Sequence, residues 1–325
     1  MRRRDFVKVL VGSAAAWPLS GRAQSALPVV GLLGSTTEQG YAPQLAAFQQ
    51  GLKEAGYVDG QNVEIVYRWA NDEYDRLPAL AADLVRRKVA VIATIGGNAA
   101  SLAAKAATTT IPIVFHGSLD PVKAGFVASL NRPGGNLTGI VTLNIDIAPK
   151  RLELLHAVVP SATGFCLLVN PTNPAVAEAN SKALQEAARK LKLQLIILRA
   201  SHERDFESVF AAAAKTGGLI ISTDGFFVNW IKQLGELSLR HAVPTVYQYR
   251  SFVDAGGLMS YGGSASDSYR LVGVYTGRIL KGEKPSELPV QQATKIELIV
   301  NLKTAKALHV TVPEPLLTRA DQVIE

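Results

Sequence analysis

The amino-acid sequence predicts an α/β protein made of two doubly wound, parallel-sheet lobes. Short runs rich in Val, Ile and Leu alternate with longer segments of helical periodicity, which is typical of parallel strands covered by helices on both faces. This alternation occurs twice along 325 residues, a length that suits two domains better than one core. We therefore expect two consecutive sheet-and-helix lobes.

The first 23 residues are expected to be an export signal that does not belong to the fold. Residues 3–8, RRDFVK, resemble a twin-arginine signal, and the apolar stretch at 9–19 is too short to span a bilayer. Small residues around Arg22 fit a signal peptidase site, so cleavage is expected near Ala23 and would release the chain into the periplasm. An ordinary basic N-terminus is the alternative interpretation.

Charge and cysteine content exclude some partners and covalent links. The formal net charge of +7 includes +4 from the expected signal, which leaves +3 on the mature chain. Such a small excess without a clustered basic face argues against a nucleic-acid partner. Cys166 is the only cysteine, so no intrachain disulfide forms, and its apolar surroundings in the sequence predict a small core residue.

Five strands separated by helices are predicted in the first half. The helix at 44–54 is followed by Gly56, which suits a helix C-cap, and the helix at 77–87 carries Leu80 and Leu84 on one apolar face. Strands joined by such helices form right-handed βαβ units. The five strands begin near Pro28, Asn62, Val89, Ile111 and Thr138.

The second half repeats this plan. Asn173 followed by proline suits the start of a helix at 175–191, and further helices are expected at 205–214 and 226–241. After a Gly/Ser stretch, one helix is predicted at 267–280 and a final helical region at 296–308. Strands are expected near Gly164, Leu193, Gly218, Pro244 and Gly257.

Polar and small residues follow the strands, where open parallel sheets bind their ligands. We expect loops from both lobes to converge on one cleft, although any single loop of this composition also serves as a turn or cap. The candidate ligand-binding residues are Ser35, Thr94, Gly96, Gly97, Asn98, His116, Ser118, Asp120, Asn173, Thr223, Asp224 and Tyr261.

These candidates suit a small charged ligand. Gly96 and Gly97 allow close approach of backbone N–H groups at the start of a helix, which favours a carboxylate. Asp224 suits an ammonium group, or it caps the helix that follows. Asp120, which precedes Pro121, is better explained as a helix cap and is a reserve ligand contact. Tyr261 is the tyrosine that we expect to contact the ligand.

Signatures of enzymes and metal sites are missing from the sequence. It contains no GxSxG, Walker GxxxxGK, GxGxxG, HExxH or CxxC motif, and the five histidines show no metal-ligand spacing. Cofactor-independent racemases of two α/β lobes use a pair of cysteines, which a single cysteine excludes. The sequence therefore predicts no cofactor, no metal and no catalytic residue.

Several segments resemble the substrate-binding proteins of ABC importers with the type I periplasmic-binding fold. They are VGLLGS, the long run FQQGLKEAGYVDGQNVEIVYRWANDEYDRLPALAADLV, the TIGG loop, IPIVFHGSLDPV, NRPGGNLTGIV and the late segment LVGVYTGRILKGEKP. The resemblance implies a multi-strand hinge, a first lobe of residues 28–142 plus 264–284, and a second lobe of residues 143–263 plus 285–325.

The same resemblance implies the function. Members of this family bind a small molecule between lobes that close like a clamp, and deliver it to a membrane permease. Characterised members bind aromatic amino acids, whereas the Gly-Gly-Asn of residues 96–98 departs from their hydroxyl-rich loops. A monomer that binds an amino acid or an aromatic or hydrophobic carboxylate is expected. A ligand-sensing receptor module and an enzyme on the same scaffold are the alternatives.

Overall fold

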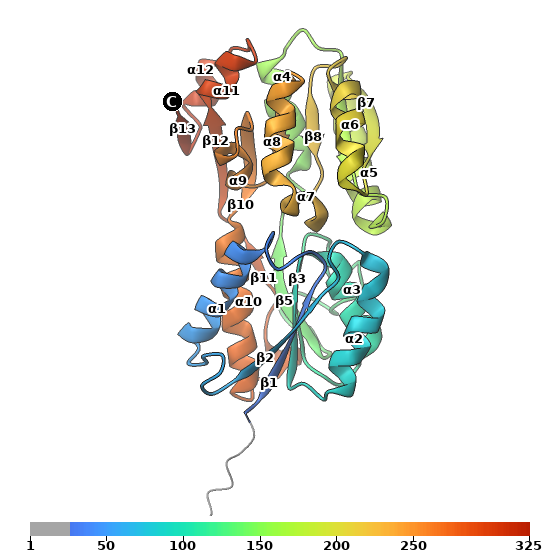
Figure 1. The fold of residues 1–325 in the computed structure, drawn as a ribbon, viewed down its shortest axis with the longest axis vertical. Coiled ribbons are helices and arrows are strands. Elements are labelled where there is room, and N and C mark those ends of the chain that lie inside the picture. Colours follow the sequence, from blue (N-terminus) through green and yellow to red (C-terminus); the bar gives the residue numbers. More distant parts are fainter. Residues whose placement is uncertain (1–26) are drawn as a thin grey trace, which may run out of the picture.

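The chain folds into two α/β lobes stacked end to end, each built around its own sheet (Figure 1). The structure, a computed structural model, describes residues 27–325, so the expected signal segment lies outside the described residues. The predicted fold class, two mostly parallel sheets covered by helices, is confirmed. Within residues 27–325, no helix combines the length and apolarity needed to cross a bilayer.

The first lobe contains a six-stranded, fully parallel sheet in the order β11-β5-β4-β3-β1-β2. Its central strands are buried because helices cover both faces, which explains their continuous apolar sequences. β11 belongs to this sheet, whereas the predicted division at residue 284 placed it in the second lobe. The strands are β1 Val29–Gly34, β2 Glu64–Trp69, β3 Val91–Ile95, β4 Ile113–Gly117, β5 Leu137–Thr142 and β11 Gln291–Ala293.

Two pairs of helices cover the first sheet. α1, Ala42–Glu54, lies against α10, Ala265–Leu280, on one face, while α2, Leu77–Arg86, and α3, Asn98–Ala107, cover the other (Figure 1). α1 and α10 approach closely because each carries a glycine at the contact. A Cβ at Gly51 would lie 1.8 Å from the Arg270 carbonyl oxygen, and one at Gly273 would lie 2.0 Å from that of Phe48.

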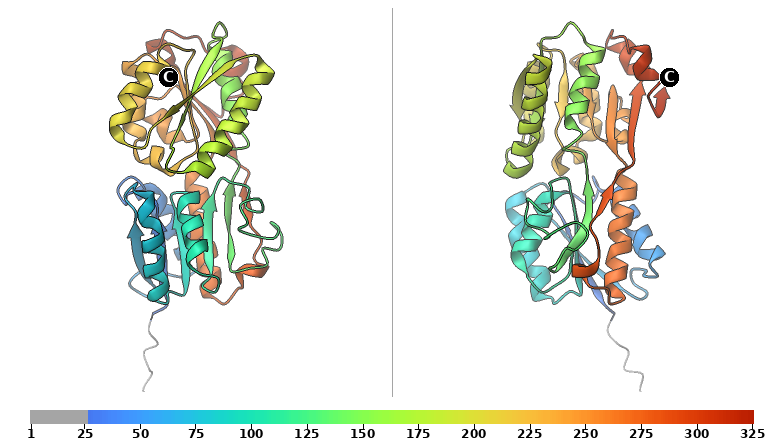
Figure 2. Two further views of the ribbon diagram at one scale, coloured as in Figure 1. Left: turned by 90° about the vertical axis from the view of Figure 1, so that its right-hand side faces the viewer. Right: turned by 180° about the vertical axis from the view of Figure 1, so that it is seen from behind.

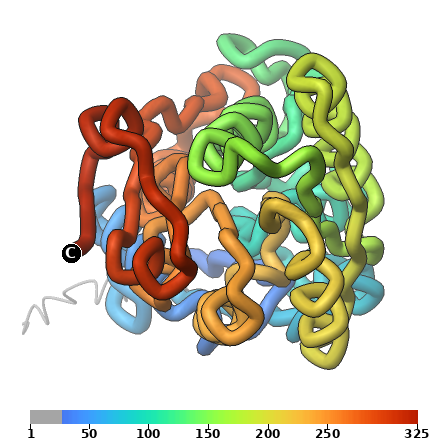
Figure 3. The backbone as a smooth tube through the Cα atoms, turned by 90° about the horizontal axis from the view of Figure 1, so that it is seen from above, coloured from blue at the N-terminus to red at the C-terminus, as the bar shows by residue number. Residues whose placement is uncertain are grey.

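The second lobe contains a seven-stranded sheet in the order β13-β12-β10-β9-β8-β6-β7, in which only the β10–β12 pair is antiparallel. Seen from above, the C-terminal segment lies along one edge of this lobe (Figure 3). The strands are β6 Gly164–Val169, β7 Gln194–Arg199, β8 Leu219–Ile221, β9 Thr245–Tyr247, β10 Met259–Gly263, β12 Ile296–Asn301 and β13 Gln322–Ile324.

The helices of the second lobe correct two predictions. The predicted helix at 226–241 is interrupted at Trp230, where it changes from α7 to α8. Residues 296–301 are not helical but form β12, because their apolar side chains complete the core against β10. The helices are α4 Ala148–Val158, α5 Pro174–Leu191, α6 Phe206–Ala213, α7 Gly225–Asn229, α8 Ile231–Arg240, α9 Arg250–Asp254, α11 Leu302–Ala307 and α12 Glu314–Leu317.

The chain passes between the sheets three times, after β5, after β10 and after β11 (Figure 2). Arg151, which is fully buried, connects the first two crossings. Its guanidinium donates to the carbonyl oxygen of Tyr261 at 2.7 Å, to that of Asn144 at 2.9 Å and to the Asn144 side-chain oxygen at 3.2 Å. Burial lowers the pKa of Arg151 to about 10, so the group remains a cation at neutral pH.

We predict that Arg151→Met lowers the free energy of unfolding by about 2–4 kcal/mol, because buried acceptors at both crossings lose charged donors. Urea denaturation followed by circular dichroism measures this loss. Arg204→Met, at an exposed position, is the control and should change the free energy by less than about 0.5 kcal/mol. An Arg151→Met protein as stable as wild type would mean that desolvation of the cation offsets its hydrogen bonds.

Candidate functional site

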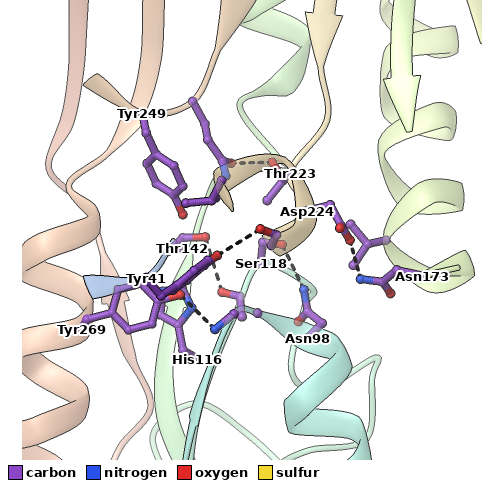
Figure 4. A pocket seen from close by; sticks show the side chains of 17 residues that line it. Tyr41, Asn98, His116, Ser118, Thr142, Asn173, Thr223, Asp224, Tyr249 and Tyr269 are labelled. Atoms are coloured by element: carbon purple, nitrogen blue, oxygen red, sulfur yellow. Dashed lines mark hydrogen bonds between the residues drawn. The ribbon is translucent and has the colours of Figure 1, made fainter. Parts of the chain in front are cut away.

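A pocket lies where the carboxyl ends of the two sheets face each other (Figure 4). Its lining comes from both lobes, as expected for a site at the ends of parallel strands. Eight predicted residues line it, namely Gly96, Gly97, Asn98, His116, Ser118, Asn173, Thr223 and Asp224. The other lining residues are Tyr41, Gly117, Thr142, Val176, Gly225, Val228, Gln248, Tyr249 and Tyr269.

One end of the pocket is aromatic (Figure 4). The His116 ring stacks on Tyr269 with centroids 4.2 Å apart, and Tyr41 meets Tyr269 edge-on at 6.1 Å. Both ring nitrogens of His116 are buried without a hydrogen-bond partner. Burial lowers the pKa of His116 to about 4, so its imidazole is neutral at physiological pH and has one donor and one acceptor available.

The loop between β3 and α3 provides part of the polar end. Gly96 and Gly97 have φ of 91° and 94°, a region that side chains other than glycine rarely adopt. Ser35 fixes this loop by donating its hydroxyl to the Gly96 carbonyl at 2.9 Å. α3 then starts at Asn98, whose side-chain NH₂ donates to the Ser118 hydroxyl at 3.1 Å. The first N–H groups of α3 have no acceptor within the helix and form an anion-binding end.

Asp224 is the only carboxyl group that lines the described pocket. Its carboxylate accepts hydrogen bonds from the side-chain amides of Asn170 and Asn173 at 3.1 and 2.7 Å, and from the Phe226 backbone N–H at 3.0 Å. The Tyr74 hydroxyl of the first lobe also donates to it, at 2.9 Å. Burial raises the pKa of Asp224, and these four donors counteract that rise. Asp224 is therefore both the cap of α7 and a wall of the pocket.

Further contacts hold the two lobes together beside the pocket. Asn229 of α7 donates to the Asp72 carboxylate at 2.7 Å and accepts from the Thr37 hydroxyl at 2.7 Å. At Gly225 the backbones come so close that an added Cβ would lie 2.3 Å from the Gly96 carbonyl oxygen. The lobes are closed onto each other, and the pocket between them has a volume of about 20 Å³, enough for about one water molecule.

Comparisons with known proteins show the family of this chain. Residues 38–324 match the family model described as ABC transporter substrate binding protein. This chain belongs to the ABC transporter substrate-binding protein family. Proteins of this family bind small-molecule ligands and work with ABC permeases; the family is one of transport proteins and not of enzymes, and its members are typically exported.

Individual relatives support the assignment. A protein named tyrosine-binding protein from Clostridioides difficile is 28% identical over 271 residues, which cover 80% of this chain and 75% of that protein. A conserved domain protein from Vibrio cholerae has a structure with a TM-score of 0.81 at 27% identity, covering 91% and 99% of the two chains. The ABC domain in complex with L-Trp from Streptococcus pneumonia gives a TM-score of 0.80 at 24% identity, covering 92% and 100%.

Four predicted site residues of this substrate-binding protein lie outside the pocket lining. Ser35 and Thr94 are buried just behind it, where Ser35 bonds to Gly96 and the Thr94 hydroxyl accepts the His116 backbone N–H at 3.2 Å. Asp120 is on the surface and caps the turn that follows it. Tyr261 packs against the core of the second lobe, on the other side of β10. Contact of the eight lining residues with a ligand remains a prediction.

The sequence analysis did not identify Tyr41 and Tyr269 because both belong to helical segments and not to strand ends. Tyr41 precedes α1, and Tyr269 lies one turn into α10, which enters the first lobe after the second crossing. Tyr249 follows β9 and was recognisable as an aromatic residue near a strand end, but Tyr261 was favoured. Thr142, the last residue of β5, and Gln248, which directly follows β9, are polar residues at strand ends of the substrate-binding protein and carried the same signal.

We predict that Gly225→Ala prevents full closure, since the new methyl group would overlap the Gly96 backbone across the interface. Small-angle scattering of the ligand-free protein should show a larger radius of gyration than that of wild type. Gly164→Ala is the control, because its added methyl group would meet its neighbours at ordinary contact distances of 3.4 Å or more. A scattering profile identical to that of wild type would contradict the closed geometry.

Closure should also depend on pH through Asp72. Burial raises its pKa to about 7, with a further rise from the nearby Asp224 charge and an opposing effect of the Asn229 hydrogen bond. The closed form therefore binds a proton more tightly than an open form, in which Asp72 is exposed. The free energy of closure becomes more favourable as pH falls from about 7 towards 4. Above about pH 7, Asp72 contributes no pH dependence to closure, because it is ionised in both forms.

The radius of gyration of the ligand-free protein should therefore decrease from pH 8 to pH 5, and Asp72→Asn should reduce this change. In the closed form His116 stays neutral over this range, because burial lowers its pKa to about 4. A pH response that is equally large in Asp72→Asn would assign the effect to another group, with the buried Asp224 as the first to test.

Proposed function

We propose that this protein captures an aromatic L-amino acid between its lobes and presents the closed complex to an ABC permease. The observation that carries this proposal is the division of the pocket into two ends. Aromatic rings line one end, and a buried carboxylate faces a helix N-terminus at the other (Figure 4). A free aromatic amino acid has the same division, with a ring at one end and an ammonium and a carboxylate at the other.

The two charges of an amino acid both need partners in a closed site, since burying an unpaired charge is costly. Asp224 is the only carboxylate that lines the described pocket, and we assign the ammonium group to it. The N–H groups of Gly97 and Asn98, at the start of α3, suit the ligand carboxylate. An ammonium group beside Asp224 would also lower the pKa of its carboxyl group and so oppose the rise that burial causes.

The ligand ring belongs at the aromatic end. Tyr41, Tyr269 and His116 offer faces and edges for offset or edge-on stacking, and the imidazole offers a hydrogen-bonding nitrogen to a ring substituent. The names of two relatives, one tyrosine-binding and one solved with L-Trp, support this ligand class. Because the pocket is so small when closed, lobe opening and side-chain movement must accompany binding.

The remaining parts of the proposal come from the sequence and the family. We propose export by the twin-arginine-like segment, cleavage near Ala23, and a periplasmic monomer that binds no nucleic acid and performs no catalysis. Members of the family are typically exported, which supports this location. The first lobe is proposed to comprise the described residues up to Thr142 and those of α10 through β11, with the second lobe formed by the rest.

Calorimetry with a matched pair of ligands tests the ammonium assignment. Wild type should bind L-tyrosine at least about 30-fold more tightly than 3-(4-hydroxyphenyl)propionate, which lacks the ammonium group. Asp224→Asn should reduce this ratio to less than about threefold, because the amide carries no charge. The ratio is measured within one variant, so a general loss of stability affects both ligands alike.

Asp120→Asn is the control for this experiment, since Asp120 is an exposed cap that should leave the ratio unchanged. A wild-type ratio in Asp224→Asn would show that the ammonium binds elsewhere. Absence of binding to both L-tyrosine and L-tryptophan in wild type would reject the proposed ligand class.

A further inference from the structure

A second cavity of about 230 Å³ adjoins the ligand pocket. It lies on the hinge side, between the start of α1, α9, β10 and the first turn of α10. Gln248 and Tyr249 line both spaces, so these two residues form the wall between them. The ligand pocket itself has only about 20 Å³, whereas the larger space behind this wall is partly open to solvent, because exposed residues such as Pro43, Ser251 and Asp254 form part of its lining.

The two wall residues are held very differently. Gln248 is fixed, because its side-chain oxygen accepts the Thr223 hydroxyl at 2.7 Å. The Tyr249 hydroxyl makes no hydrogen bond with any residue of the described chain, and its ring meets Tyr247 only edge-on, at 5.8 Å. Tyr249 is therefore the part of the wall that can move at little cost in broken hydrogen bonds.

The second cavity can accept the Tyr249 side chain. Gln44 lines this cavity, is only 8% exposed, and has a buried side-chain oxygen without a hydrogen-bond partner. Such an oxygen is an acceptor for a phenolic hydroxyl. The lining of this cavity also includes small residues, among them Gly262, Gly263 and Ala265. Movement of the ring in this direction would transfer volume from the second cavity to the ligand pocket.

We propose that Tyr249 is a movable partition that makes room for the ligand by turning its ring into the cavity beside Gln44. Tyr249 then determines specificity, because the space behind it limits the size of the ligand side chain that the pocket accepts. The inference depends on the proposed function only for the choice of ligand. An enlarged pocket could bind a ring, whereas the pocket as described holds about one water molecule.

A double-mutant cycle tests the partition. Ala265→Leu fills the second cavity from α10, and should weaken L-tyrosine binding about tenfold when Tyr249 is present. In a Tyr249→Ala background the ring no longer needs this space, so Ala265→Leu should change the affinity less than about twofold. Tyr249→Phe retains the ring and should retain the tenfold effect. Ala46→Leu, at an exposed position on the outer side of α1, is the matched control and should change neither affinity.

The partition would be overturned if Ala265→Leu changed the affinity equally in the wild-type and Tyr249→Ala backgrounds, or changed it in neither. Either result would leave the binding of L-tyrosine by wild type intact. Loss of wild-type binding would instead count against the proposed ligand class. A crystal structure of ligand-free Tyr249→Ala then tests, without any ligand, whether Tyr249 separates the two spaces. The two cavities should merge into one, and two cavities that remain separate would overturn the inference.

Discussion

A carboxylate buried between two lobes must be matched by donors or by an opposite charge, and Asp224 shows how this chain meets that requirement. Asn170, Asn173 and the start of α7 supply donors from the second lobe, while Tyr74 reaches it from the first. The closed arrangement thus completes the shell around Asp224. Opening the lobes removes Tyr74, and a ligand ammonium can take a place beside the carboxylate. In the proposed function, Asp224 therefore couples the charge of the ligand to lobe closure.

The two sheets and the chain crossings between them hold Asp224 in position at the interface of the lobes. The central strands of each sheet are buried, and only the three crossings connect the two sheets, so the proposed opening would take place at these crossings. Arg151 joins the first two crossings through its hydrogen bonds to Asn144 and Tyr261. Across the interface, Gly225 lets the start of α7 approach the Gly96 carbonyl, where a side chain at position 225 would separate the two backbones. The hinge and the interface thus contribute separately to closure.

The sequence was sufficient for the fold class and for most of the polar end of the pocket. The apolar runs that form strands are visible in the local sequence, and the carboxyl ends of parallel strands meet at one edge of a sheet, so Asn98 and Ser118 could be grouped without a structure. Asp224 could be added to them because loops from both lobes were expected to converge on one cleft. Tyr41 and Tyr269 could not, because a long-range packing of α1 on α10 brings them together. β12 was missed for the same reason, since its strand conformation depends on pairing with the distant β10.

The central claim is that the ammonium group of an aromatic amino acid lies beside Asp224 in the closed cleft. A crystal structure of the wild-type protein with L-tyrosine tests this most directly. We expect the ligand nitrogen within about 3 Å of the Asp224 carboxylate, the ligand carboxylate at the start of α3, and the ligand ring beside Tyr269 and His116. A ligand bound in the reverse orientation, with its carboxylate towards Asp224, or bound outside this cleft, would contradict it.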